Sequence, residues 1–415
     1  MSRFLFFLYR KLLDLLLILL YPLLRVILPA KENHHRLGWH APSLNQAIWI
    51  HAASVGEVNA AKALVQEILD QYPQRDILLT TTSTTGMKTA GQIHERIHTH
   101  LLPLDIPILM NRFIRKVNPS ILILIETEIW PVMLYRLKRM KVPVLWVNAR
   151  ISDRSYPKYK RMTILWNLIR DEITQVNTQS ELDAERFKSL GFQQVVNMHN
   201  LKFALKQPEF DRQALRAAWN LPEDAFILVF GSSRPGEESM LHDALPLLQA
   251  EIPHLHVILA PRHLNRLPEV QSIFTDIPFS LHSEQRQDSK LIIVDSMGVL
   301  VEAYALSDIA VIGGSFYDFG GHNPLEAAYY GLPIIMGEYH SSCRDSVAKL
   351  QSAGGICLSN TDEFTKDIIT LAKDEPGRIR MGEAAKSVMK QYAHSLEGNL
   401  ETIRHWLIDK AEYHG

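Results

Sequence analysis

Residues 120–125 have the sequence Ser-Ile-Leu-Ile-Leu-Ile, and this short apolar run decides the fold class. Its last five positions lack the polar alternation of a strand that has one face in water. An unbroken β-branched and leucine run of this length is typical of a strand buried on both faces of a parallel sheet. We therefore predict an α/β protein with a parallel sheet built around this strand.

Comparable runs lie on both sides of it. Strands are predicted at 47–51, 76–81, 142–147 and 172–176. One helix is expected to begin near Glu57, and a separate one is expected through Gly86 to Arg96. The alternation pauses in a polar, helical segment at 202–221. It restarts with strands at 226–230, 256–260, 291–294, 309–312 and 333–336. Strands and helices at this spacing predict βαβ units in two domains, with ligands beyond the carboxyl ends of the strands.

Length and composition agree with two globular domains. The chain has 415 residues, of which 47% are hydrophobic and 21% charged, as in ordinary folded proteins. The net charge is -1, so no nucleic-acid partner is expected. The two cysteines, Cys343 and Cys357, are too few for a disulfide framework and agree with a reducing compartment.

The N-terminus differs in composition from the rest of the chain. Residues 4–28 are mostly Leu, Ile, Phe, Val and Tyr, interrupted by Arg10, Lys11, Asp14, Pro22 and Arg25. A helix lying in the membrane interface tolerates these charges best, whereas a spanning helix must bury them. A cleaved signal peptide and a buried core helix are the remaining readings. We expect an interfacial anchor on the cytoplasmic leaflet, with a basic cluster facing anionic headgroups: Arg25, Lys31, His34, His35 and Arg36.

Polar clusters follow the strands of the first half. Ser54, Gly56 and Glu57 come just after the strand at 47–51. Glu57 would stand at the start of a helix, where a carboxylate can act as general base toward a hydroxyl. The alternative is that it only complements the helix dipole.

Two more clusters follow the strands at 120–125 and 142–147. Glu126-Thr127-Glu128 places two carboxylates at the end of the first of these, although they could simply cap the helix that begins at Pro131. Arg150 follows the second strand and suits an anionic group. An interdomain ion pair is its alternative.

The second half carries the features of an anion site. Residues 231–238, with Ser233 and Arg234, form a glycine-containing turn after a strand, and Pro261-Arg262-His263 follows the next strand. The segment Gly320-Gly321-His322-Asn323-Pro324-Leu325-Glu326 combines glycines with the start of a helix. Amides at a helix start bind anions, and Glu326 is suited to accept hydrogen bonds from ribose hydroxyls.

Nothing in the sequence indicates a metal site. His94 and His98 have chelating i, i+4 spacing, but the helix expected there has an otherwise polar surface, which favours solvated histidines. The chain contains no Asp-x-Asp pair to hold a divalent cation on a nucleotide diphosphate. No metal and no cofactor are expected.

Five motifs in fixed order resemble the Kdo (3-deoxy-D-manno-octulosonic acid) transferase family. They are residues 54–60 (Ser-Val-Gly-Glu-Val-Asn-Ala), 126–131 (Glu-Thr-Glu-Ile-Trp-Pro), 148–152 (Asn-Ala-Arg-Ile-Ser), 261–263 (Pro-Arg-His) and 320–326. The resemblance covers nearly the whole chain. It implies a GT-B fold, in which two Rossmann-like domains face each other across a cleft, with an N-terminal anchor helix.

The implied activity is inverting transfer of Kdo from CMP-Kdo to a lipid A precursor, lipid IVA, at the cytoplasmic side of the inner membrane. In that family scheme Glu57 is the general base, and Ser54, Gly56, Glu128 and Arg150 line the acceptor side. The donor side comprises Ser233, Arg234, Pro261, Arg262, His263, Gly321, His322, Asn323 and Glu326. The expected domains are an anchor (1–30), an acceptor domain (31–205), a linker (206–221), a donor domain (222–394) and a C-terminal helix (395–415) that packs back on the acceptor domain.

The chain departs from the family pattern mainly in its donor half. Members usually carry Thr-His and a glutamate where this chain has Ser233-Arg234-Pro235, a glutamate at Val299 and an aspartate near Ala204. Residues 337–340, Gly-Glu-Tyr-His, also differ from the usual Gly-Pro-His. These departures keep two alternatives open: a diverged GT-B paralogue with another nucleotide sugar or acceptor, and a GT-B-type sugar-nucleotide epimerase.

Overall fold

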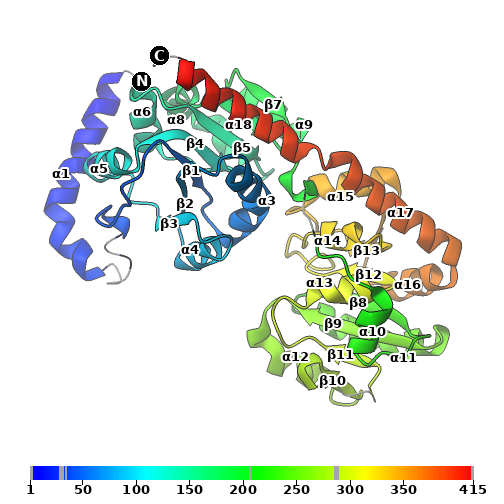
Figure 1. Cartoon of the computed structure of the whole chain (residues 1–415). Helices are drawn as coiled ribbons and strands as arrows, with labels where there is room; N and C mark the ends of the chain where they lie inside the picture. Colours follow the sequence, from blue (N-terminus) through cyan, green and yellow to red (C-terminus); the bar gives the residue numbers. More distant parts are fainter. Residues whose placement is uncertain (1–2, 28–31, 33–34, 205–206, 285–288, 413–415) are drawn as a thin grey trace. The chain divides into compact units, whose positions relative to one another are not determined.

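The protein is described from a computed structural model that covers residues 3–27, 32, 35–204, 207–284 and 289–412. The chain divides into two compact units. The first contains Met1–Ala204 and His394–Gly415, and the second contains Leu205–Ala393. Each unit is an α/β domain with its own parallel sheet (Figure 1).

The first sheet has seven parallel strands in the order β3-β2-β1-β4-β5-β6-β7. They are β1 (Ala47–His51), β2 (Ile77–Thr81), β3 (Ile97–Leu101), β4 (Pro119–Ile125), β5 (Val144–Ala149), β6 (Gln175–Thr178) and β7 (Val195–Asn197). All seven residues of β4 are buried. The prediction that 120–125 forms a strand covered on both faces is therefore confirmed.

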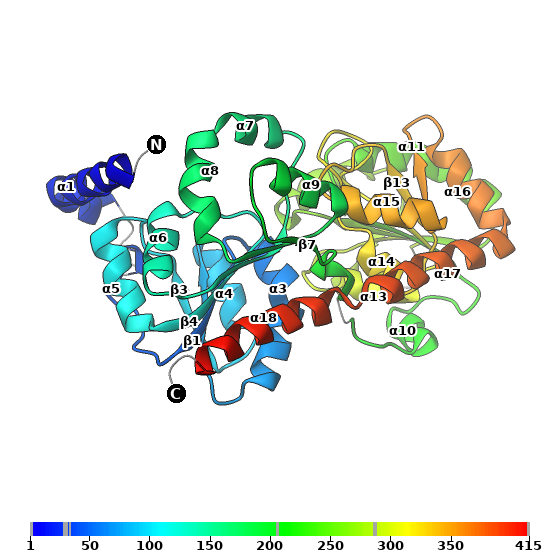
Figure 2. The same ribbon diagram turned by 90° about the horizontal axis from the view of Figure 1, so that it is seen from above.

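Helices cover both faces of this sheet (Figure 2). They are α3 (Val55–Gln71), α4 (Thr84–Gly91), α5 (Pro107–Val117), α6 (Pro131–Arg139), α7 (Tyr156–Arg161), α8 (Thr163–Ile169) and α9 (Glu181–Ser189). Alternate residues of β4 point to opposite sides: Leu122 packs with α5 and α6, whereas Ile121 and Ile123 pack with α3. This alternation follows from the pleat of the strand.

The C-terminal helix α18 (Ser395–Glu412) packs on the first unit. Its Leu400 and Ile403 are buried in the same core as Ile121. Its Asn399 Oδ1 accepts a hydrogen bond of 2.9 Å from Asn177 Nδ2 at the end of β6. Burial of a satisfied amide pair fixes the register of the helix on the sheet.

One predicted helix is wrong. The segment expected to be helical through Arg96 ends at Gly91, and Ile97–Leu101 forms the edge strand β3. His98 lies in this strand and His94 precedes it, so the two histidines do not share a helix face. Short polar edge strands give a weak apolar signal, which explains why β3 was missed.

The helix α1 (Arg3–Ile27) lies along the first unit beside α5. Its Leu17 is buried against Leu37 and Leu109, and Asp14 Oδ1 accepts a hydrogen bond of 3.0 Å from Ile108 N. Among the residues that the structure describes, no helix is long and apolar enough to cross a membrane.

The basic cluster expected after α1 is only partly described. The side chains of Arg25, Lys31 and His34 lie outside the described part. Arg36 donates hydrogen bonds to the carbonyl oxygens of Thr82 and Leu102. Its guanidinium therefore holds the chain segment after α1 on the first unit.

The second sheet also has seven parallel strands, in the order β10-β11-β9-β8-β12-β13-β14. They are β8 (Phe226–Ser233), β9 (Leu255–Pro261), β10 (Phe279–Leu281), β11 (Leu291–Ile293), β12 (Ile309–Ile312), β13 (Ile334–Gly337) and β14 (Ile356–Ser359). The helices are α10 (Arg212–Ala218), α11 (Glu237–Glu251), α12 (Leu267–Ile273), α13 (Leu300–Leu306), α14 (Leu325–Tyr329), α15 (Arg344–Ala353), α16 (Phe364–Lys373) and α17 (Glu375–Tyr392). The five predicted strands are present, and the short strands β10 and β14 were missed.

Residues 206–221, expected as a linker, contain α10, which is fastened to the second unit. Arg212 and Arg216 form ion pairs of 2.7 and 2.8 Å with Asp308. Trp219 Nε1 donates a hydrogen bond of 3.2 Å to Glu302. The described part of this segment thus belongs to the fold of the second unit.

Candidate active site

In the first unit the predicted polar clusters meet at the carboxyl ends of β1, β4 and β5. The strand order reverses between β1 and β4, and such a reversal opens a crevice where α/β proteins bind ligands. A cavity of about 330 Å³ lies there, lined by Glu57, Glu126, Thr127, Arg150, Ile151, Ser152, Ser155 and Tyr159. The structure therefore brings Glu57 and Arg150 into one site.

Glu57 lies in the first turn of α3, where hydrogen bonds join it to the N-cap residue Ser54 and to Ala53. Ser54 Oγ accepts a hydrogen bond of 3.3 Å from Glu57 N, and Glu57 Oε2 accepts one of 2.6 Å from Ala53 N. The first of these bonds satisfies an amide that the start of the helix leaves open. The side chain thus stabilises the start of the helix through hydrogen bonds, and it also faces the cavity.

The environment of Glu57 raises the pKa of its carboxyl group to about 7. Burial is the largest cause, and the nearby charges of Glu126 and Glu128 add to it, whereas the hydrogen bonds from Ala53 and Ser54 oppose it. Burial and like charges both disfavour the ionised form. A carboxylate with a pKa close to neutral pH is suited to accept a proton from a substrate hydroxyl.

Glu128 is held by two aromatic side chains. Its Oε2 accepts a hydrogen bond of 2.9 Å from Trp130 Nε1 and lies 3.7 Å from His51 Nε2. His51 is fully buried at the end of β1, and its Nδ1 lies 2.9 Å from Thr80 Oγ1. His51 is not among the site residues predicted from the sequence, although it is the last residue of a buried strand.

The loop of residues 126–128 does not cap α6. The amides of Val132 and Met133 donate hydrogen bonds of 2.9 and 2.8 Å to Asp105, which follows β3. Thr127 is instead hydrogen-bonded to the backbone of Arg150. The loops after β4 and β5 are therefore tied together, which fixes Arg150 beside the acidic residues.

Replacing Glu126 with glutamine is expected to shift the acidic limb of the kcat/KM profile to lower pH. Loss of this neighbouring charge lowers the pKa of Glu57, because Glu126 is the largest raising cause after burial. The fraction of ionised Glu57 at pH 6 then increases. Rates measured from pH 5 to 9 check this; Glu128→Gln should give a smaller shift, and an unchanged limb in E126Q would contradict the assignment.

In the second unit a buried carboxylate organises two loops. Glu237, at the start of α11, accepts hydrogen bonds of 2.8–3.0 Å from the amides of Arg234, Gly314, Ser315 and Phe316. It is fully buried, and burial raises the pKa of its carboxyl group against the lowering effect of these amides. Glu237 thus joins the turn after β8 to the loop after β12.

Four basic side chains surround these loops. Arg234 Nη1 lies 2.5 Å from His263 Nε2, and its guanidinium lies 5.1 Å from the centre of the Phe319 ring. The pKa of His322 falls to about 4 through burial and the charges of Arg262, Arg234 and His263. His322 is therefore uncharged at neutral pH, and its buried Nε2 has no hydrogen-bond partner among the described residues. It can hydrogen-bond a ligand that also contacts the two arginines.

The remaining predicted donor residues support this basic group. Gly321 has φ +74°, and a Cβ there would lie 2.7 Å from Met336 Cε, so glycine is required by both conformation and space. Asn323 Oδ1 accepts a hydrogen bond of 3.4 Å from Leu325 N at the start of α14. Ser233 Oγ donates one of 2.8 Å to the buried Glu238, and Pro261 ends β9.

Glu326 lies in the first turn of α14, a helix of five residues. Its charge raises the pKa values of Tyr304 and Tyr330, after burial as the main cause. Glu326 therefore lies close to both tyrosine side chains. The arrangement offers cations and backbone amides to the anionic part of a ligand, and one carboxylate to its hydroxyl groups.

Known proteins resemble this chain in sequence and in fold. A family model described as 3-deoxy-D-manno-octulosonic-acid transferase (kdotransferase) matches residues 31–205, and one described as glycosyl transferases group 1 matches residues 282–388. A bifunctional glycosyltransferase/methyltransferase of Fusobacterium nucleatum is 31% identical over 88% of this chain, which spans 63% of that protein.

A 3-deoxy-D-manno-octulosonic acid transferase of Haemophilus influenzae is 31% identical over 87% of both chains. Among solved structures, Anabaena HepE in complex with UDP has a TM-score of 0.62 at 16% identity, covering 86% of this chain and all of that one. This likeness shows the fold alone, which is GT-B-like. The sequence matches show that the chain belongs to the Kdo transferase family of glycosyltransferases.

Proposed function

We propose that this protein transfers Kdo from CMP-Kdo to the lipid A precursor lipid IVA with inversion at the anomeric carbon. The observation that carries the proposal is Glu57, a half-buried carboxylate with a pKa of about 7 that lines the cavity at the end of β1. As general base it removes the proton of the acceptor hydroxyl, whose oxygen then attacks the anomeric carbon while CMP leaves. Ser54, Gly56, Glu128 and Arg150 belong to the acceptor side.

The basic group of the second unit supports an anionic donor. CMP-Kdo carries a phosphodiester and a carboxylate, and both the arginines and the loop amides suit such groups. We propose that Arg234, where the family usually has Thr-His, contacts the phosphate together with Arg262 and His322, and that Glu326 binds the ribose. Preorganised cations and amides stabilise the leaving CMP, so the proposal includes no metal and no cofactor.

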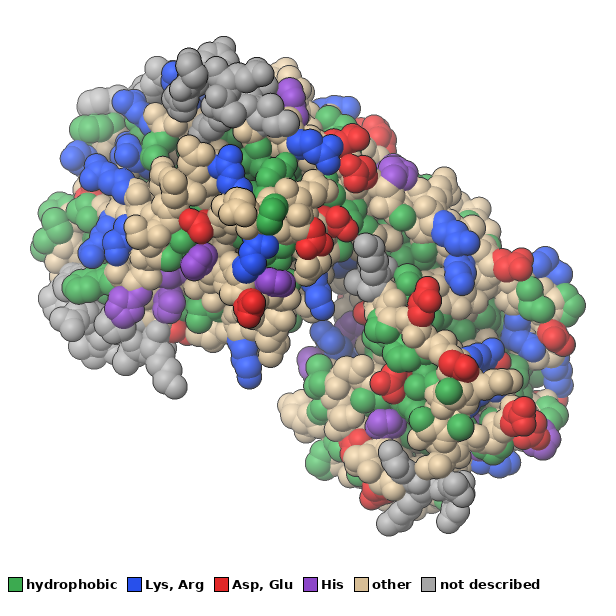
Figure 3. Space-filling model, viewed as in Figure 1, with side chains coloured by type: hydrophobic (Ala, Val, Ile, Leu, Met, Phe, Trp, Pro, Cys, Tyr) green, Lys and Arg blue, Asp and Glu red, His purple; other side chains and the backbone are tan. Residues whose placement is uncertain are grey.

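We also propose that the first unit rests on the cytoplasmic side of the inner membrane through an interfacial α1. Large apolar side chains of α1 are exposed: Phe7, Leu8, Leu12, Leu15, Ile18 and Leu19. On neighbouring α5, Arg112 and Arg115 are exposed, and Arg112 lies 5.5 Å from the Trp39 ring. Figure 3 shows Lys and Arg beside hydrophobic side chains along this side of the first unit. Such mixtures bind anionic bilayers.

The direct test is incubation of the full chain with CMP-Kdo and lipid IVA, followed by mass spectrometry of the lipid. The expected product is heavier by whole Kdo units, with release of CMP. No product would contradict the proposal. Calorimetry with CMP, UDP and GDP complements the assay, because tighter binding of UDP or GDP would favour a diverged transferase or an epimerase.

A further inference from the structure

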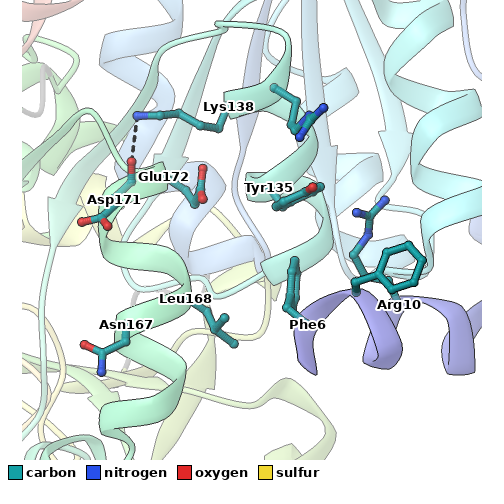
Figure 4. Close-up of a pocket in the computed structure, with 10 residues that line it drawn as sticks. Phe6, Arg10, Tyr135, Lys138, Asn167, Leu168, Asp171 and Glu172 are labelled. Carbon is teal, nitrogen blue, oxygen red and sulfur yellow. Dashed lines mark hydrogen bonds between the residues drawn. The ribbon is translucent and has the colours of Figure 1, made fainter. Parts of the chain in front are cut away.

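A second cavity lies on the first unit where α1 meets α6, α8 and the 3-10 turn Arg170–Glu172 (Figure 4). Its volume is about 410 Å³, within the range of roughly 300–1,000 Å³ typical of small-molecule sites. It is lined by Phe6, Phe7, Arg10, Tyr135, Lys138, Arg139, Asn167, Leu168, Asp171 and Glu172. None of these residues belongs to the site of Glu57.

One side of this cavity is basic and aromatic. The guanidinium of Arg10 lies 4.3 Å from the centre of the Tyr135 ring, and that of Arg139 lies 5.9 Å from it. Phe6 packs edge-on against the same ring at 5.2 Å. Arg10 Nε is buried without a hydrogen-bond partner among the described residues. The ring therefore holds the Arg10 guanidinium at the wall of the cavity, where its positive charge suits an anionic ligand.

The other side of the cavity is acidic. Lys138 Nζ donates a hydrogen bond of 2.8 Å to the backbone oxygen of Asp171, which ties α6 to the turn that carries Asp171 and Glu172 (Figure 4). Asp171 lines the cavity; its side chain is 80% exposed, and its Oδ1 lies 3.7 Å from Arg170 Nε. A ligand in this cavity meets cations and carboxylates together.

A purely anionic group would satisfy the arginines but would be repelled by Asp171 and Glu172. A zwitterion that joins a phosphate to a primary ammonium satisfies both sides, because the ammonium donates hydrogen bonds to carboxylates. The exposed apolar residues of α1 begin at the rim of the cavity, since Phe7 lines it and is 50% exposed. The ligand is thus expected to continue into an apolar tail.

We propose that this cavity binds the phosphoethanolamine headgroup of a bilayer phospholipid. Arg10 and Arg139 contact the phosphate, Glu172 and Asp171 receive the ammonium, and the acyl chains lie along the outer face of α1. This inference rests on the proposed membrane attachment of the first unit. Apolar contact and charge alone would bind the first unit to a membrane without selecting among headgroups. A headgroup site in this cavity would add selectivity for one of them.

The test is binding of the full chain to phosphatidylcholine vesicles, alone or containing the same mole fraction of phosphatidylethanolamine or phosphatidylglycerol. We expect about ten-fold tighter binding with phosphatidylethanolamine, because a trimethylammonium cannot donate hydrogen bonds to the carboxylates. Soluble glycerophosphoethanolamine should compete with the vesicles, and glycerophosphocholine should not.

Matched variants locate the effect. Glu172→Gln should remove the preference for phosphatidylethanolamine, and Asp171→Asn, at an exposed position, should reduce it. Glu185→Gln, an exposed acid on α9 outside the cavity, should leave it intact. Arg10→Gln should weaken phosphatidylethanolamine binding more than Lys11→Gln, which removes a charge from the same helix but not from the cavity.

Three outcomes would overturn the inference. Equal binding to all vesicles would remove the headgroup site while the membrane attachment stands. Tightest binding to phosphatidylglycerol would indicate an anionic headgroup instead, and a phosphatidylethanolamine preference that persists in E172Q would indicate bilayer packing and not this cavity. Absence of binding to any vesicle would instead contradict the membrane attachment itself.

Discussion

Replacing Glu57 with glutamine is expected to lower kcat by a factor of about 10²–10⁴, the contribution typical of a general base. Glutamine keeps the size and can still accept the hydrogen bond that Ala53 N donates to this side chain, so α3 keeps its cap. What it cannot do is take a proton from the acceptor hydroxyl. Steady-state rates with CMP-Kdo and lipid IVA measure the loss, and calorimetric CMP affinity should stay near the wild-type value.

The pH dependence separates a base from a structural residue. In the wild type, kcat/KM should rise with pH and level off above about 7, because the raised pKa of Glu57 leaves it protonated at lower pH. E57Q should lose this limb. Glu95→Gln, at an exposed position away from the site, should retain it; wild-type turnover in E57Q would remove Glu57 from its role.

Much of the architecture was predictable because parallel strands are buried on both faces. The runs around Leu122 and Leu228 are unbroken, and both form central strands of their sheets. The polar clusters were predictable for a related reason, since polar side chains directly after such strands are placed together at one edge. Glu57 and Arg150 accordingly meet in a single cavity.

What escaped prediction depends on contacts between distant segments. Asp105 caps α6 from another loop, and no local pattern relates the two. The strand Ile97–Leu101 lies at a sheet edge, so its exposed His98 hides the apolar signal. The pKa of Glu57 is raised mainly by burial and by the charge of Glu126. Both effects arise only after β1 and β4 pair in the folded sheet.

Glu237 is the clearest residue whose role depends on contacts between distant segments. Its replacement by alanine should strongly destabilise the second unit. Its carboxylate accepts hydrogen bonds from four backbone amides at a fully buried position. Each buried donor left unsatisfied costs about 1–3 kcal/mol. We therefore expect the second unit to be destabilised by more than about 3 kcal/mol, with loss of CMP binding.

Glutamine at position 237 should rescue only part of this loss, because its amide nitrogen would face backbone donors where the second carboxylate oxygen now accepts. Amide hydrogen exchange at Gly314, Ser315 and Phe316 reports the effect locally, without requiring two-state unfolding of a two-domain chain. Protection should fall in E237A and partly in E237Q, whereas Glu383→Gln, at an exposed position of α17, should change nothing. Unchanged protection in E237A would show that the loop after β12 keeps its conformation without this carboxylate. Phosphate binding by the loop would then depend on Gly313, Gly314 and the arginines alone.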